Sequence, residues 1–108
     1  MTLTLQDAQH ASYKIFRKIN DRLLANGNKV HSPFTIVAGL LEETEEVATA
    51  VKSLEGLKPS EENITYQMLA KKLNDLLYSA FVLAEHYGVN LEETFLEHVN
   101  DSLLRFLT

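Results

Sequence analysis

Cysteine is absent from the 108-residue chain, so disulfides, thiolate zinc sites and thiol nucleophiles are all excluded. Basic residues are also few, because 10 Lys and Arg stand against 15 Asp and Glu and give a formal net charge of −5. A surface that binds a nucleic-acid polymer normally needs a concentrated basic patch, and this charge balance argues against one. We therefore expect neither thiol chemistry nor binding to a nucleic-acid polymer.

Long hydrophobic runs are missing as well. No stretch approaches the ~18 apolar residues that a membrane span needs. The opening sequence MTLTLQDAQH contains glutamines and an acid, so it does not resemble a signal peptide. With 45% hydrophobic and 23% charged residues, the composition is ordinary for a soluble globular protein of single-domain length. The sequence predicts one domain over residues 1–108, located in the cytoplasm and without a membrane partner.

Proline and glycine are scarce, with two and four copies, so little interrupts a helix. Helical periodicity recurs along the chain and strand-like alternation does not. Ser32 is a suitable N-cap before Pro33, and Asn90 with Glu93 forms a capping box for the last helix. The predicted helices cover about 4–26, 33–54, 62–87 and 91–106. The expected fold is an all-α, four-helix bundle with short connections.

The segment LLEETEEV, residues 40–47, crowds four glutamates into an otherwise apolar helix. At about 100° per residue, Glu42 and Glu45 lie opposite the apolar arc and are expected to face water. Glu43 lies only about 20° outside that arc, and Glu46 lies beside it on the flank at i+3, so both are expected at the core boundary, close enough to share a metal ion. A carboxylate beside apolar neighbours is costly unless it is paired or binds a cation. The predicted arc, about 140° wide, contains Ile36, Val37, Leu40, Leu41, Thr44, Val47, Ala48, Val51 and Leu54.

The third predicted helix carries Asp75 in an unexpected position, within a second, weaker apolar stripe. One interpretation is that Asp75 has a functional partner, and the other is a surface aspartate or a salt bridge to Lys71 or Lys72. If the second stripe is exposed, it would form an unusual apolar patch for a monomer. We therefore expect a homo-oligomer, either a dimer or a tetramer, with this helix near an interface. The main face comprises Leu69, Leu73, Leu76, Leu77, Ala80, Leu83, Ala84 and Tyr87, and the second stripe comprises Ile64, Met68, Tyr78 and Val82.

Two long segments, HSPFTIVAGLLEETEEVATAV and KKLNDLLYSAFVLAEHYGVNLEETF, resemble the MazG-like nucleotide pyrophosphohydrolases. The signature of this all-α superfamily is Glu-x-x-Glu on one helix and Glu-x-x-Asp on the next. Glu43 and Glu46 match the first half, and Asp75 matches the end of the second. The HSP segment resembles the deoxycytidine-triphosphate branch, whereas DLLYSAFVLAEHYGVNLEE is closer to the phosphoribosyl-ATP branch. The resemblance covers about residues 30–106.

The resemblance implies hydrolysis of a nucleoside triphosphate between its α- and β-phosphates, releasing pyrophosphate and a monophosphate. It also implies Mg²⁺ or Mn²⁺ as cofactor, since such ions prefer oxygen ligands and pair with phosphates. Glu43, Glu46 and Asp75 are then the candidate metal ligands and catalytic groups. One of the carboxylates can serve as base for the attacking water.

Lys72 departs from the family pattern, because it occupies the position of the second glutamate of the signature. It can form an internal ion pair with Glu43 or Glu46, which would leave a degenerate, metal-free bundle that acts structurally or binds proteins. It can instead bind substrate phosphate as a point charge. In a third interpretation the protein uses fewer metal ions and works slowly. Further candidates for substrate contacts are Lys14, Arg17, His31, Asn100 and Arg105. The competing interpretations are a solvated helix surface for Lys14 and Arg17 and a structural role for His31 before the N-cap.

Overall fold

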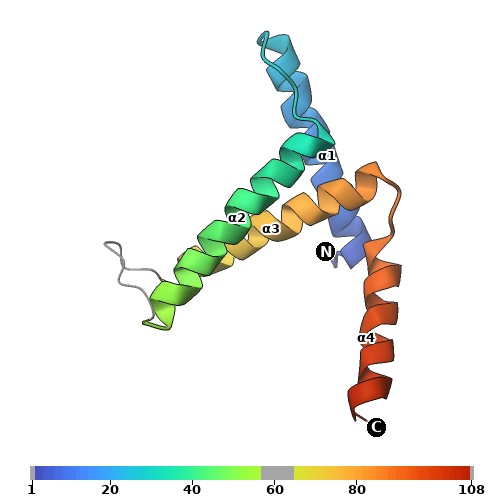
Figure 1. Cartoon of the computed structure of the whole chain (residues 1–108). Coiled ribbons are helices and arrows are strands. Elements are labelled where there is room, and N and C mark those ends of the chain that lie inside the picture. Colours follow the sequence, from blue (N-terminus) through green and yellow to red (C-terminus); the bar gives the residue numbers. More distant parts are fainter. Residues whose placement is uncertain (1, 57–64, 108) are drawn as a thin grey trace. The chain divides into compact units, whose positions relative to one another are not determined.

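The structure is a computed structural model that describes residues 2–56 and 65–107. Within these ranges all regular structure is helical: α1 is Leu5–Ala25, α2 is Pro33–Leu54, α3 is Tyr66–His86 and α4 is Leu91–Leu107 (Figure 1). The predicted all-α class with four helices is therefore confirmed for the described residues. Predicted and observed ends agree within one residue, except for the start of the third helix. The predicted start at residue 62 and the stripe residue Ile64 lie outside the described residues.

Local side-chain contacts explain where the helices begin. Ser32 Oγ accepts a hydrogen bond from the backbone N–H of Thr35 at 3.2 Å, and Pro33 follows as the first helical residue, as predicted. Asn90 Oδ1 accepts from the backbone N–H of Glu93 at 3.1 Å, which confirms its predicted role as the cap of α4. These polar side chains satisfy N–H groups that have no partner inside the helix.

The chain divides into two compact units, residues 1–30 with 81–108 and residues 31–80. The first unit contains α1, the end of α3 from Phe81, and α4. Its α3–α4 turn passes through Gly88, whose φ of +72° is a conformation that glycine adopts without strain. The backbone N–H of Val89 donates to the carbonyl of Ala84 at 2.8 Å and closes the end of α3. Its buried apolar side chains are Phe16, Phe81, Val82 and Ala84.

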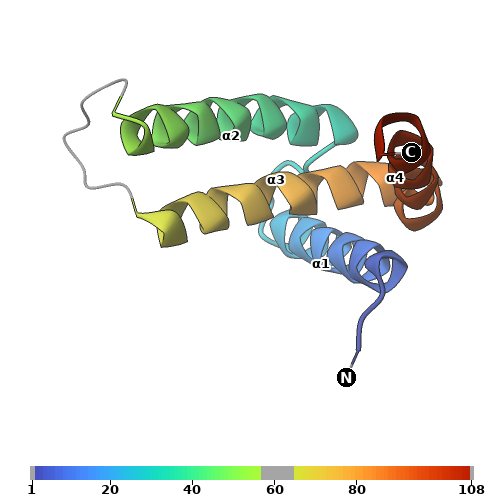
Figure 2. The same ribbon diagram turned by 90° about the horizontal axis from the view of Figure 1, so that it is seen from below.

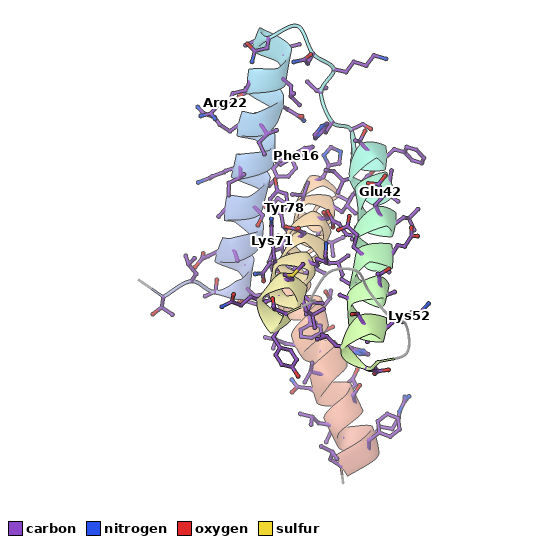
Figure 3. All side chains as sticks on the ribbon, turned by 90° about the vertical axis from the view of Figure 1, so that its left-hand side faces the viewer. Phe16, Arg22, Glu42, Lys52, Lys71 and Tyr78 are labelled. Atoms are coloured by element: carbon purple, nitrogen blue, oxygen red, sulfur yellow. The ribbon has the colours of Figure 1, made fainter. Side chains whose placement is uncertain are left out.

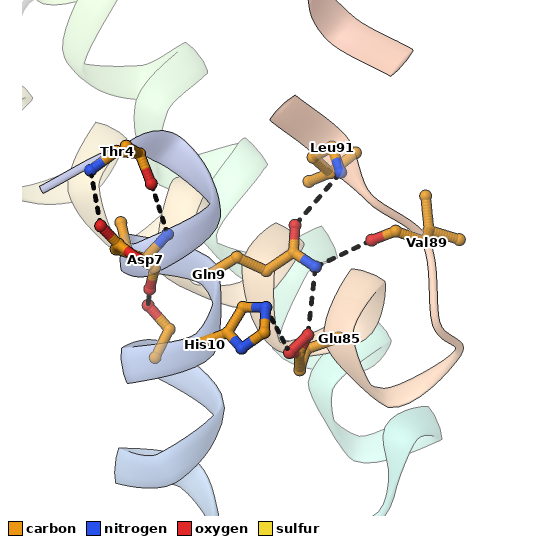
Figure 4. Close-up of polar contacts among 9 residues, drawn as sticks. Thr4, Asp7, Gln9, His10, Glu85, Val89 and Leu91 are labelled. Atoms are coloured by element: carbon orange, nitrogen blue, oxygen red, sulfur yellow. Dashed lines mark hydrogen bonds and ion pairs between the residues drawn. The ribbon is translucent and has the colours of Figure 1, made fainter. Parts of the chain in front are cut away.

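Gln9 connects α1 to the α3–α4 turn within this unit (Figure 4). Its side chain is 2% exposed, and its Nε2 donates to the carbonyl of Val89 at 2.8 Å. Its Oε1 accepts from the backbone N–H of Leu91 at 3.3 Å. The same Nε2 donates to Glu85 Oε1 at 3.4 Å, and His10 Nε2 lies 3.5 Å from Glu85 Oε2. A buried amide with both ends bonded positions α1 against the turn.

The second unit contains α2 and α3 up to Ala80, which run side by side (Figures 1 and 2). Ala50 of α2 is completely buried, and Glu43 and Val47 on the same face are half-buried. Five residues of the predicted arc are exposed, so the prediction that they belong to the packed face was wrong: Val37, Leu41, Thr44, Ala48 and Leu54. The packed face of α2 is rotated toward Glu43, because packing against a neighbouring helix selects one part of a broad apolar arc.

The prediction for the two faces of α3 also needs correction. Val82 is 1% exposed, and Met68 and Tyr78 are half-buried, so the described part of the second stripe is covered. Leu73 and Leu77, from the predicted main face, are 47% and 50% exposed. When a helix has apolar residues on two sides, the sequence pattern alone does not show which side is packed in the folded protein. None of the described helices is both long and apolar enough to cross a membrane.

Candidate active site

Four of the residues singled out in the sequence come together within the second unit. Glu43 and Glu46 project from α2, and Lys72 and Asp75 come from α3. The two helices are joined by side-chain contacts from Lys72 to Glu46 and from Ser79 to Glu43. Figure 3 shows the side chains of this unit, with Glu42 and Lys52 labelled on α2 and Lys71 and Tyr78 on α3. Glu42 and Glu45 are exposed, as predicted, but Glu46 is exposed as well, so the prediction that it lies with Glu43 at the core boundary was wrong.

Glu43 is the half-buried acid of the group. Its Oε2 accepts a hydrogen bond from Ser79 Oγ at 3.4 Å, and Ser79 itself is only 5% exposed. Burial raises the pKa of Glu43, and the negative charge of Asp75 raises it further. The hydrogen bond from Ser79 opposes these effects, while Glu46 and Glu42 add smaller contributions that also raise the pKa. Glu43 is therefore a carboxylate that binds a proton more readily than a free glutamate.

Lys72 forms an ion pair with Glu46, with Nζ 3.0 Å from Oε2. This was one of the pairings that the sequence left open. The alternative of a salt bridge between Asp75 and Lys71 or Lys72 is not found among the described residues, and Asp75 is exposed. The side chains of Lys72 and Glu46 are 28% and 53% exposed, so water screens the pair. Exposed pairs of this kind contribute about 0–1 kcal/mol to stability.

A hollow of about 300 Å³ lies beside this ion pair and contains both signs of charge. Lys71 shares the hollow with Lys72 but has no ion pair among the described residues. A polar hollow with both ammonium and carboxylate groups suits a ligand that carries phosphates and a cation together. The lining residues are Glu46, Met68, Lys71, Lys72 and Asp75.

The acids fit a divalent cation by their chemistry, although they do not form a closed cage. In the part of the chain that the structure describes, no group of three or more His, Asp or Glu is close enough to hold a metal ion. Mg²⁺ does not require such a group, since it is usually bound by one or two carboxylates together with waters and substrate phosphates. The charges of Asp75 and Glu46 both raise the pKa of Glu43, so these carboxylates repel one another. A hard cation with oxygen ligands would relieve that repulsion.

Sequence reasoning missed Ser79, whose hydroxyl donates a hydrogen bond to Glu43. Ser79 follows Asp75 by four residues, a spacing that places both on one side of a helix and that could have identified it. The hydroxyl of Tyr78 is buried, and no described group forms a hydrogen bond with it. Burial raises the pKa of this phenol, so it remains protonated.

The remaining candidates are distributed over other elements. Lys14 and Arg17 are exposed on α1, and Asn100 and Arg105 are exposed on α4. His31 is exposed immediately before the N-cap of α2. Their roles as substrate contacts stay predictions.

The acids of the Glu-x-x-Glu and Asp75 motifs lie on the neighbouring helices α2 and α3, which is consistent with the class that the sequence resembles, the MazG-like nucleotide pyrophosphohydrolases. Within this class the model of one family, phosphoribosyl-ATP pyrophosphohydrolase, matches residues 6–102. The chain belongs to this family, and the resemblance inferred from its motifs is confirmed. No curated protein and no solved structure matches the chain.

Proposed function

We propose that the protein is a Mg²⁺-assisted pyrophosphohydrolase that hydrolyses a nucleotide between its α- and β-phosphates. Family membership supports the reaction class and makes phosphoribosyl-ATP the first substrate to assay, ahead of simple nucleoside triphosphates. The observation that carries the proposal is Glu43, a half-buried carboxylate whose pKa is raised by burial and by the charge of Asp75, which itself lines a hollow together with Lys72. The uninterrupted match over residues 6–102 supports one MazG-like domain.

Glu43 acts as the general base in this proposal. Its raised pKa makes the carboxylate a better proton acceptor than a free glutamate. The attacking water gives its proton to Glu43 as its oxygen forms a bond to the α-phosphorus. The bond from that phosphorus to the bridging oxygen breaks, and pyrophosphate leaves with the bonding electrons. Ser79 orients the carboxylate by donating to Oε2.

The other charged groups position the phosphates. Asp75 and Glu46 would hold the cation through their carboxylate oxygens, and the cation would neutralise charge on the phosphate oxygens. Lys72 supplies a positive charge where the signature that the sequence resembles has a glutamate, and its flexible stem suits a phosphate contact. The cation can be Mg²⁺ or Mn²⁺, since both accept carboxylate and phosphate oxygens.

The ion pair of Lys72 with Glu46 also favours a second candidate, a catalytically degenerate bundle that acts as a structural or protein-interaction module. In that case Lys72 permanently neutralises one of the acids. The two candidates differ in whether pyrophosphate is released in the presence of Mg²⁺.

The discriminating experiment is a pyrophosphate-release assay with phosphoribosyl-ATP and the common triphosphates, with Mg²⁺ and with excess chelator. We expect release that depends on Mg²⁺ and falls about 10²- to 10⁴-fold in Glu43→Gln, because the variant removes the base. Glu45→Gln is the matched control, since it makes the same chemical change on the exposed face of α2. Equal release by Glu43→Gln, or release that persists in chelator, would contradict the proposal. Absence of release with every substrate would favour the degenerate bundle.

We also propose that the protein forms a homo-oligomer. Large apolar side chains are exposed along α2, where Phe34, Val37 and Leu41 are 79%, 39% and 70% exposed. These residues recur at helical spacing and form a row that a second copy of the chain can cover. Light scattering at micromolar concentration should give at least twice the mass of the 12.2 kDa chain. A stable monomer would contradict this, and Leu41→Lys should weaken the oligomer.

A further inference from the structure

Lys72 has two possible partners that compete for its ammonium group, namely Glu46 and a ligand in the hollow. Its Nζ lies 3.0 Å from Glu46 Oε2, and it also lines the hollow that contains Asp75. Glu46 has no other ion pair or hydrogen bond among the described residues. While Lys72 holds Glu46, the positive charge opposes a cation at this carboxylate. Once Lys72 leaves, Glu46 becomes an available ligand.

The pair is suited to exchange of partners. Both side chains are partly exposed, at 28% and 53%, so separating them does not strand a buried charge. Lysine carries a compact charge on a flexible four-carbon stem, so its ammonium can move between neighbouring oxygens without backbone movement. A polyphosphate entering the hollow offers several charged oxygens, whereas Glu46 offers one carboxylate.

We propose that Lys72 couples metal binding to nucleotide binding by exchanging Glu46 for a phosphate of the nucleotide. The inference rests on the proposed function, because it assigns the nucleotide and the cation to this hollow. In the protein without nucleotide, Lys72 forms its ion pair with Glu46, and the site binds the cation weakly. When the nucleotide binds, its phosphate attracts the ammonium and Glu46 is released to the cation. Lys72 thereby links the two binding events, at a position where the family signature has a glutamate.

Coupling between two binding sites is reciprocal, so the cation must strengthen nucleotide binding by the same factor that the nucleotide strengthens cation binding. If Lys72 only bound phosphate, replacing it would not change the affinity for Mg²⁺ in the absence of nucleotide. If Lys72 only paired with Glu46, replacing it would not change the affinity for the nucleotide in the absence of metal. The exchange predicts that both quantities change and that the coupling between them is lost.

The test measures binding rather than turnover, using the non-hydrolysable analogue α,β-methylene-ATP and Mg²⁺. Calorimetry gives the Kd for Mg²⁺ alone, the Kd of the analogue in chelator, and the Kd of the analogue in saturating Mg²⁺. The ratio of the last two values is the coupling factor. Complex formation between Mg²⁺ and the analogue in solution is common to all variants, and it therefore cancels when their ratios are compared.

The variant is Lys72→Met, which keeps the apolar stem and removes the charge, with Lys72→Gln as a second replacement. Lys71→Met is the matched control, because it removes one positive charge from the same hollow without breaking an ion pair. Circular dichroism should show unchanged helix content in all three, since the side chains are not fully buried.

We expect the wild-type protein and Lys71→Met to have similar coupling factors. The coupling factor of Lys72→Met should be about tenfold smaller, a difference within the usual range of such couplings. Mg²⁺ alone should bind Lys72→Met several-fold more tightly than wild type. An unchanged coupling factor in both Lys72 variants, with binding intact, would overturn the exchange while the proposed function stands. Failure of the wild-type protein to bind either Mg²⁺ or the analogue would also overturn the exchange, whereas the proposed function is tested separately by the pyrophosphate-release assay with phosphoribosyl-ATP.

Discussion

Replacing Lys72 with glutamate changes the charge beside Glu46 by two units and restores the acid that the family signature has at this position. The wild-type ammonium lies 3.0 Å from Glu46 Oε2, so the new carboxylate falls close to any cation that Glu46 binds. At about 5 Å, one unit charge interacts with a divalent ion by ~6.6 kcal/mol at a dielectric constant of 20 and by ~1.7 kcal/mol at 80.

The exposure of the two side chains decides between these limits. At 28% and 53% exposed, Lys72 and Glu46 are in contact with water, which favours the value at high dielectric constant. Two units then contribute about 3 kcal/mol, which is reduced by dissolved salt and by the entropy of ordering the new side chain. Even about 1.4 kcal/mol corresponds to tenfold in affinity. We therefore expect Lys72→Glu to bind Mg²⁺ about tenfold more tightly than the wild-type protein.

Isothermal titration with Mg²⁺ measures this directly, with Lys71→Glu as the control for a general change of charge in the hollow. Thermal melts supply an independent readout. Without metal, Lys72→Glu loses an ion pair and gains a repulsion with Glu46, which should lower the free energy of unfolding by about 1 kcal/mol. For a chain of this length, such a loss lowers the Tm by several degrees. Saturating Mg²⁺ should recover the loss. An affinity within twofold of wild type, or an equal gain in Lys71→Glu, would show that Lys72 does not govern the cation site.

Two further predictions concern stability. Because the pKa of Glu43 is raised above 4.5, the folded state binds its proton more tightly than the unfolded chain, and stability falls as pH rises through the folded pKa. Glu43→Gln should therefore raise Tm at pH 7 and lose that advantage below pH 4.5, as melts across this range would test; a constant difference at all pH values would contradict the origin of the shift. Gln9→Leu should destabilise the protein by about 2–3 kcal/mol in urea titrations, because it leaves the carbonyl of Val89 and the N–H of Leu91 unpaired. Gln67→Leu, at an exposed position, should change stability by less than about 0.5 kcal/mol, and an equal effect of both would contradict the role of Gln9.

Local rules account for the parts of this protein that the sequence predicts well. Helix ends depend on a few neighbouring residues, so Ser32 with Pro33 and Asn90 with Glu93 could be assigned without tertiary information. The placement of three of the four glutamates follows from the 3.6-residue period, which put Glu43 at the core boundary and Glu42 and Glu45 outside. The motifs on the second and third helices were sufficient for the family.

Only the tertiary structure determined which face of each helix is packed against its neighbour. The apolar arc of α2 was broad enough to permit several rotations, and packing selected the one that buries Ala50 and exposes Thr44 and Ala48. A helix pattern determines which residues share a face, but the neighbour determines which face is covered. That choice brought Ser79 to Glu43 and Lys72 to Glu46. The sequence by itself determined the helices and the acids, while the contact between α2 and α3 determined which acid is half-buried with a raised pKa and which is held by a lysine.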